Sequence, residues 1–130
     1  MREILFRGKR LDNGAWETGS LVIVRMDCHD AQYYIADKMT GYHTPVDPST
    51  VGQYTGMKDK NGKRIFEGDI AKVLQGKDKD IAYVGFENGA FMLYPKTGNI
   101  YERTLWEYWY NDWDVEVIGN ITDNQELLEK

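Results

Sequence analysis

The chain has 130 residues, a length that suits one domain built around one hydrophobic core. Its formal net charge of -5 disfavours wholesale attraction to phosphate backbones or to anionic lipid. The single cysteine, Cys28, excludes an internal disulfide, and no apolar run is long enough for a secretory leader or a membrane-spanning helix. We therefore expect one domain over residues 1–130, located in the cytoplasm and without a membrane partner.

The first part of the chain predicts a β-hairpin. Residues 3–11 read as a strand, and Asn13-Gly14 tolerates the positive φ that tight hairpin turns require. Trp16 and the apolar run 21–24 then supply the return strand. A short strand is predicted at residues 32–36, where Tyr-Tyr-Ile is flanked by polar residues.

Residues 37–62 have a different composition. This stretch contains Pro45 and Pro48, two of the three prolines of the chain, and several glycines. Proline and glycine both interrupt regular structure. The sequence therefore predicts an ordered but irregular loop here.

The most regular pattern begins at residue 65. Three apolar runs, at 70–74, 81–86 and 90–94, are separated by a charged tip and by the turn sequence Glu87-Asn88-Gly89. This spacing predicts a three-stranded antiparallel meander. A final strand is predicted at residues 115–121, before a polar tail.

An unusual density of aromatic residues lies between the meander and the final strand. Residues 100–113 contain Tyr101, Trp106, Tyr108, Trp109, Tyr110 and Trp113. Their spacing matches neither the helical nor the strand period, so both a one-turn helix and an irregular strand fit the pattern.

Short strands joined by turns, without long amphipathic helical windows, predict a mainly β fold. We expect a small antiparallel barrel, or a barrel-like meander of hairpins with irregular loops. The part from Glu67 to Tyr94 also resembles small SH3-like barrels in the way that Gly68-Asp69 leads into a strand.

Two long motifs, in order along the chain, resemble the YopX family. The first is VGQYTGMKDKNGK at residues 51–63, followed by IFEGDI at 65–70. The second is VIGNI at residues 117–121 with the polar segment after it, and the opening FRGK at residues 6–9 with Trp16 also fits. Residues 25–44 depart most from the family pattern.

The resemblance implies a protein encoded by phages, or by prophages in bacterial genomes, with a largely β fold. It implies no assigned activity, and it supplies no catalytic, cofactor or metal residues to carry over. The candidate sites must therefore come from the residues themselves.

One candidate is a basic loop in the first motif, a possible contact for nucleic acid. Basic side chains beside an aromatic ring can hold a single strand by charge and stacking. A structural interpretation competes with it, because Asn61-Gly62 predicts a turn that Asp59 can cap and Gly56 permits a backbone reversal. The residues concerned are Tyr54, Lys58, Lys60, Lys63 and Arg64.

The second candidate is the aromatic segment, because Trp and Tyr are enriched at the centres of protein interfaces. A domain of this size cannot easily bury all of these rings, so we expect some of them to contact another copy or another protein. The predicted interface residues are Trp106, Trp109, Tyr110 and Trp113.

Enzymatic and metal-binding interpretations have less support. Glu67 and Asp69 stand at strand spacing, but a cap at the entry of a strand, with Gly68 giving the bend, explains them more simply than cation or acid-base chemistry. The metal-capable residues Cys28, His29, Asp30 and His43 lack the paired spacing of a zinc site. The sequence therefore predicts no enzyme, metal or cofactor.

The leading hypothesis is a noncatalytic phage or prophage accessory protein of the bacterial cytoplasm, a β module that self-assembles or binds a phage or host protein. The alternative hypothesis is a small nucleic-acid-binding module that uses the basic loop.

Overall fold

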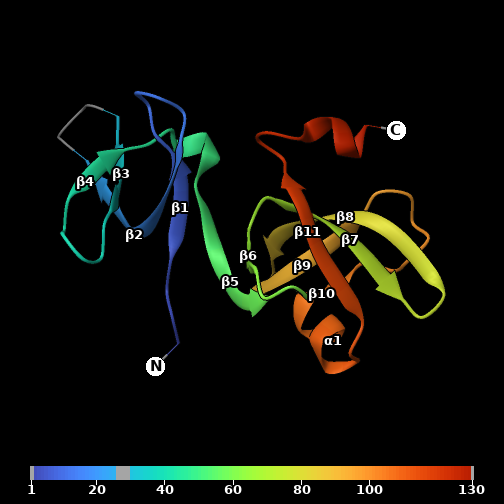
Figure 1. Cartoon of the computed structure of the whole chain (residues 1–130). Helices are drawn as coiled ribbons and strands as arrows, with labels where there is room; N and C mark the ends of the chain where they lie inside the picture. Colours follow the sequence, from blue (N-terminus) through green and yellow to red (C-terminus); the bar gives the residue numbers. More distant parts are fainter. Residues whose placement is uncertain (1, 26–29, 130) are drawn as a thin grey trace. The chain divides into compact units, whose positions relative to one another are not determined.

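The computed structural model describes residues 2–25 and 30–129, which form two compact units (Figure 1). The first unit is Met1–Tyr54 and the second is Thr55–Lys130. All strand pairs within the two sheets for which a register is given are antiparallel. Among the described residues no helix is long and apolar enough to cross a membrane.

The first sheet has the strand order β4-β3-β2-β1-β5-β6, and the first unit contains its strands up to the beginning of β5. The turn between β1 and β2 is closed by the side chain of Asn13, which accepts a hydrogen bond from the backbone of Ala15, and Gly14 has φ 71°. This confirms the predicted hairpin. The elements are β1 (Phe6–Lys9), β2 (Trp16–Val24), β3 (Gln32–Ala36), β4 (His43–Pro45), the 3-10 helix η1 (Pro48–Thr50) and the beginning of β5 (Gly52–Lys58).

The prediction of an irregular loop over residues 37–62 is wrong in part. This stretch contains β4, η1 and the seven-residue strand β5. The sequence does not reveal β5, because Gly52 and Gly56 supply no side chain to the alternating pattern of a strand. Gly56 also has φ 87°, outside the usual range of strands. Pro48 is the first residue of η1, and the side chain of Asp47, directly before it, caps this helix.

The second unit contains a five-stranded sheet with the order β10-β9-β8-β7-β11. The predicted meander is confirmed as β7, β8 and β9, with Ile70 opposite Tyr83 and Tyr83 opposite Tyr94. The elements after β5 are β6 (Arg64–Phe66), β7 (Asp69–Gln75), β8 (Asp78–Glu87), β9 (Ala90–Pro95), β10 (Arg103–Thr104), the helix α1 (Leu105–Tyr110), β11 (Asp114–Asn120) and the 3-10 helix η2 (Gln125–Leu128).

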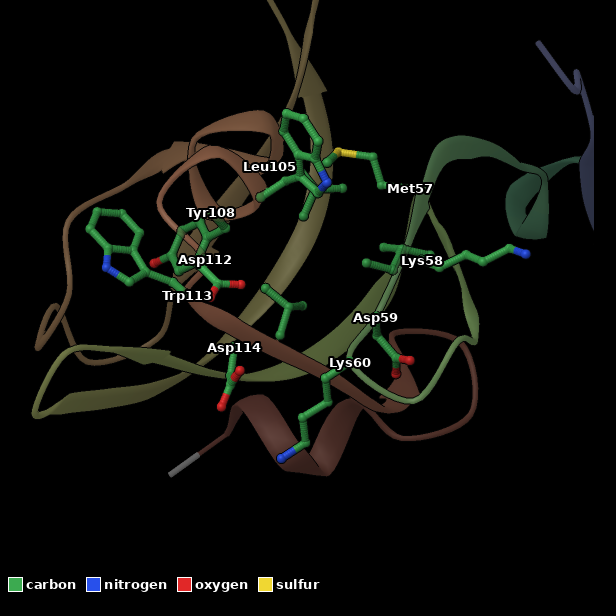
Figure 2. Close-up of a pocket in the computed structure, with 12 residues that line it drawn as sticks. Met57, Lys58, Asp59, Lys60, Leu105, Tyr108, Asp112, Trp113 and Asp114 are labelled. Atoms are coloured by element: carbon green, nitrogen blue, oxygen red, sulfur yellow. The ribbon is translucent and has the colours of Figure 1, made fainter.

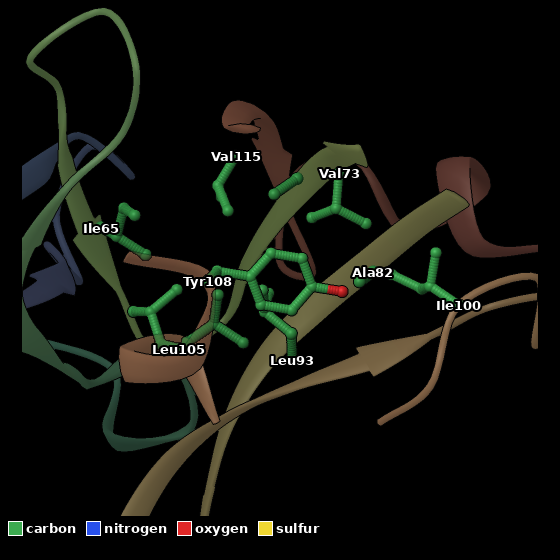
Figure 3. Close-up of a cluster of buried hydrophobic side chains, with 10 residues drawn as sticks. Ile65, Val73, Ala82, Leu93, Ile100, Leu105, Tyr108 and Val115 are labelled. Carbon is green, nitrogen blue, oxygen red and sulfur yellow. The ribbon is translucent and has the colours of Figure 1, made fainter. Parts of the chain in front are cut away.

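The larger hydrophobic core belongs to the second unit (Figure 3). One face of its sheet contributes alternate residues of β7, β8 and β9, as a period of two requires. Side chains from β6, α1 and the segment before β10 cover this face. The cluster consists of Ile65, Ala71, Val73, Ala82, Val84, Leu93, Ile100, Leu105, Tyr108 and Val115.

The fold is thus mainly β, as predicted, and its hairpins form two antiparallel sheets. The strands described here form a meander of hairpins rather than a closed barrel. The chain divides into two compact units, and the smaller buried set, which belongs to the first unit, includes Leu5, Ile35 and Val46. A single domain over residues 1–130 stays a prediction.

Candidate functional site

The aromatic segment folds into the short helix α1, so the one-turn helix is the correct alternative. A capping box starts it: the Thr104 hydroxyl accepts from the backbone N–H of Glu107 at 3.2 Å, and the Glu107 carboxylate accepts from the backbone N–H of Thr104 at 3.3 Å. Arg103 pairs with Glu107 at 3.0 Å and lowers the pKa of that carboxyl. These contacts fix six residues that are too few to form a stable helix alone.

The rings of α1 divide into a buried and an exposed set. Leu105 and Tyr108 are buried in the core. Trp106, Trp109 and Tyr110 are 55%, 65% and 67% exposed, and we call these three residues the aromatic face. The rings of Trp106 and Tyr110, one turn apart, are stacked with centroids 4.9 Å apart.

The fourth predicted interface residue, Trp113, lies partly buried against the core. Its ring meets that of Tyr108 edge-on at 5.2 Å, and the guanidinium of Arg103 lies over it at 5.6 Å. Trp113 therefore supports the fold, whereas the aromatic face is exposed to solvent.

The basic loop is the turn between β5 and β6, and the predicted cap is confirmed. One carboxylate oxygen of Asp59 accepts from the backbone N–H groups of Asn61 and Lys63, both at 2.9 Å, and Gly62 has φ 81°. The other oxygen accepts from the backbone N–H of Val117 in β11 at 2.9 Å.

Burial would raise the pKa of Asp59, but these three hydrogen bonds outweigh it and lower the pKa below its usual range. The buried carboxylate therefore holds the turn against β11 as an ionised group. Lys60 adds to this attachment, because its backbone N–H donates to the carbonyl of Val115 at 3.0 Å.

The five predicted nucleic-acid contacts are not equivalent. The cationic residues Lys58, Lys60, Lys63 and Arg64 are exposed. Tyr54 is only 6% exposed and belongs to the first unit, so its ring offers no free face on which a base can stack. Lys60 is partly neutralised by Glu116 at 3.8 Å.

A pocket of about 170 Å³ brings together residues that the sequence assigned to two separate sites. Figure 2 shows two groups around it, one from the end of β5 and the turn after it, and one from α1 and the segment leading into β11. The basic loop contributes Lys58 and Lys60, and the aromatic segment contributes Trp109 and Trp113. The other lining residues are Met57, Asp59, Ile65, Leu105, Tyr108, Asp112, Asp114 and Val115.

Asp112 and Asp114 are members of the site that sequence reasoning missed. Asp112 directly follows the C-cap residue Asn111 of α1 and has φ 56°. An available signal was Asn111-Asp112 after the aromatic run, because both residue types tolerate a left-handed conformation at the end of a helix.

A family model described as YopX protein matches residues 5–129. The chain belongs to the YopX family. Two solved structures are similar to this YopX-family protein over nearly its whole length, and at their level of identity they show a shared fold.

The first is the crystal structure of protein EF1440 from Enterococcus faecalis, which is 22% identical with a TM-score of 0.60 and covers 98% of this chain and 99% of its own. The second is the crystal structure of protein yopX from Bacillus subtilis, 21% identical with a TM-score of 0.59, covering 95% of this chain and 97% of its own. No curated protein matches the chain.

Asp69, one of the two carboxylates considered for cation or acid-base chemistry, has a structural partner in this YopX-family protein. Asp69 is 1% exposed and accepts from the backbone N–H of Phe66 at 2.8 Å, with Gly68 at φ 88°, as expected for a cap at the entry of β7. Among residues 2–25 and 30–129 no group of three His, Cys, Asp or Glu side chains is placed to hold a metal. Cys28 and His29 lie outside the described residues.

Proposed function

We propose that this YopX-family protein is a noncatalytic protein-interaction module that associates with further copies of itself through the aromatic face. We further propose that it is a phage or prophage accessory protein acting in the cytoplasm of a bacterial host. The bacterial sources of both similar structures support this setting. The observation that carries the proposal is the exposure of the three large rings on one short helix.

The aromatic face has the properties of an interface centre. Trp and Tyr are the residue types that contribute most to binding when a partner buries them. Leaving three such rings in water forfeits the free energy that their burial provides, about 25 cal/mol for each Å² of apolar area. A second protein surface removes this disadvantage.

The face is also held rigidly before any partner arrives. The capping box fixes the start of α1, and Leu105 and Tyr108 anchor its other side in the core. Ordering the contact residues in advance reduces the entropy lost on binding. This is the second reason to assign the contact to α1.

The noncatalytic part of the proposal is supported by how the buried carboxylates are used. Asp59, Asp69 and Asp80 each accept hydrogen bonds from backbone N–H groups in turns or at strand entries. Their oxygens are thus engaged by the backbone, which suits a structural role better than proton transfer.

Trp109→Glu tests the proposal. The purified wild type is expected to show an average mass that rises with concentration in light scattering or sedimentation equilibrium. The variant is expected to associate about tenfold more weakly or worse, because loss of a central Trp costs about 2 kcal/mol or more. Trp109 is the better choice than Trp113, whose contact with the core couples its replacement to folding.

Tyr42→Glu is the matched control, since Tyr42 is 71% exposed and belongs to the first unit. It introduces the same charge and should leave the mass unchanged. Equal masses for the wild type and the folded Trp109→Glu variant at every concentration would refute the proposal.

The alternative function, nucleic-acid binding through the basic loop, has weaker support. Its cationic side chains are exposed, but the buried ring of Tyr54 removes the stacking component, and Glu116 and Asp59 lie among the same residues. The net charge of -5 acts in the same direction.

A further inference from the structure

We propose that the pocket beside α1 receives a single basic side chain, arginine in preference to lysine, presented by the second copy of this protein that binds the aromatic face. The biological role of this pocket rests on the proposed function. The binding chemistry does not, and it can be tested with a free arginine derivative.

The size of the pocket selects one side chain rather than a whole metabolite. Its volume of about 170 Å³ is below the roughly 300–1,000 Å³ of most small-molecule sites. Ile65, Leu105 and Val115 give it an apolar lining. An apolar lining of this extent suits the methylene stem of a long side chain, whose charged end stays at the mouth.

The mouth carries negative charge that the chain itself does not neutralise. In the described part of the chain, the carboxylates of Asp112 and Asp114 make no ion pair or hydrogen bond. Lys60 is engaged by Glu116, and Figure 2 shows the Lys58 side chain extending away from Asp112 and Asp114. A cation from a partner is therefore the missing complement.

Trp109 supplies a free aromatic surface for that cation. Its ring is 65% exposed and lies in no ring or cation contact with the residues described. The same region already packs a guanidinium on aromatic rings, because Arg103 lies 5.7 Å from the ring centre of Tyr101 and 5.6 Å from that of Trp113. Arginine stacks on such rings better than lysine, which gives the preference.

The backbone conformation of Asp112 is a further reason to expect a cation at this pocket. At this position after a helix the left-handed conformation usually belongs to glycine, and a residue with a Cβ is disfavoured there. The chain nevertheless places a carboxylate at this position, with φ 56°. The last turn of α1 has no basic residue, so the negative end of the helix adds to the attraction for a cation.

The test is a titration of the full-length protein with N-acetyl-arginine methylamide, followed through the NMR signals of the Trp indole N–H groups. The signal of Trp109, assigned with Trp109→Phe, should shift with a millimolar dissociation constant. N-acetyl-lysine methylamide should bind more weakly. The apolar N-acetyl-norleucine methylamide and the acidic N-acetyl-glutamate methylamide should produce little shift.

Two variants and a control make the test specific. Asp112→Gly and Asp114→Asn should each weaken binding of the arginine probe about three- to tenfold. Asp112→Gly should unfold at the same temperature as the wild type or higher, because glycine accepts this φ freely, so lost binding cannot be attributed to lost folding. Asp78→Asn removes the same charge from the exposed first residue of β8 and should bind as the wild type does.

A Trp109 signal that does not move, or that moves equally with the norleucine or glutamate probe, would overturn the inference. This result is independent of the association measurement. If Trp109→Glu loses self-association but the wild type binds no arginine probe, the interface stands and the assignment of the pocket falls. If the wild type binds the arginine probe but Trp109→Glu associates as before, only the interface falls.

Discussion

The hydroxyl group of Tyr108 is buried without a hydrogen-bond partner among the described residues, while its ring belongs to the core (Figure 3). Burial raises the pKa of this hydroxyl to about 12. Tyr108→Phe is therefore expected to keep the free energy of unfolding or to raise it by up to about 1 kcal/mol, because it removes a polar group that folding desolvates without compensation. Urea unfolding followed by far-ultraviolet circular dichroism measures this difference.

Tyr94→Phe is the comparison for this experiment. The Tyr94 hydroxyl donates to the Glu87 carboxylate at 2.7 Å, a hydrogen bond that raises the pKa of Tyr94 to about 12. Tyr94→Phe removes this hydrogen bond and should lower the free energy of unfolding measurably. A loss in Tyr108→Phe as large as that in Tyr94→Phe would mean that the Tyr108 hydroxyl has a partner in solution.

At the scale of elements, the turn between β5 and β6 depends on one carboxylate. Asp59→Asn should lower the free energy of unfolding by about 1–3 kcal/mol at pH 7, because the amide NH₂ group cannot accept from Val117 and would leave that partly buried N–H without a partner. Asp37→Asn is the control. Asp37 caps an exposed turn in the same way, accepting from Met39 and Thr40, and its replacement should cost less.

The same carboxylate makes a stability difference that depends on pH. The pKa of Asp59 is lowered in the folded protein, so its contribution is present above the unfolded value of about 4 and is lost as the pH falls through the folded value. The difference in the free energy of unfolding between the wild type and Asp59→Asn should therefore become smaller on acidification below about pH 4. A difference in the free energy of unfolding that stays constant down to about pH 2 would contradict this role of the Asp59 carboxylate.

Elements whose signals are local could be predicted from the sequence. The sequence predicts the first hairpin and the turn between β8 and β9 from Asn-Gly, and the turn between β7 and β8 from a charged tip between two apolar runs. The sequence leaves the type of α1 open because the helix buries only Leu105 and Tyr108, which produces no amphipathic pattern, although Thr104 and Glu107 have the spacing of a capping box.

The candidate site could be predicted only in halves. Both halves were recognised by composition, as basic and aromatic residues. Their meeting at one pocket depends on two hydrogen bonds with β11: Asp59 accepts from Val117, and Lys60 donates to Val115. The partners in each bond are more than fifty positions apart along the chain. Contacts of such sequence separation follow from tertiary packing and leave no periodic trace.

For the whole molecule, the division into two units predicts uneven stability. Amide hydrogens of β7, β8 and β9 should exchange slowest, because these strands surround the ten-residue core cluster. Those of β3 and β4 in the first unit should exchange faster, since fewer buried apolar residues hold them. Hydrogen exchange measured by mass spectrometry or NMR separates the two groups.

Equal protection in the two units would instead indicate a single cooperative domain, which is what the length of the chain suggests and what the family match over residues 5–129 is compatible with. The comparison can be made in the same samples that are used for the association measurement, so that protection gained by self-association is recognised from its dependence on concentration.

The attachment of the turn to β11 also limits how the protein can polymerise. β11 is the last strand of its sheet, and an open outer strand is a template on which other chains add and grow into fibres. In this protein the outward N–H of Val117 donates to the Asp59 carboxylate, and the outward carbonyl of Val115 accepts from the backbone N–H of Lys60. A register shift between Val117 and Gly119 also bends the strand. Strand-by-strand growth from this edge is thereby blocked, so β11 should not seed fibres even where the protein accumulates to high concentration.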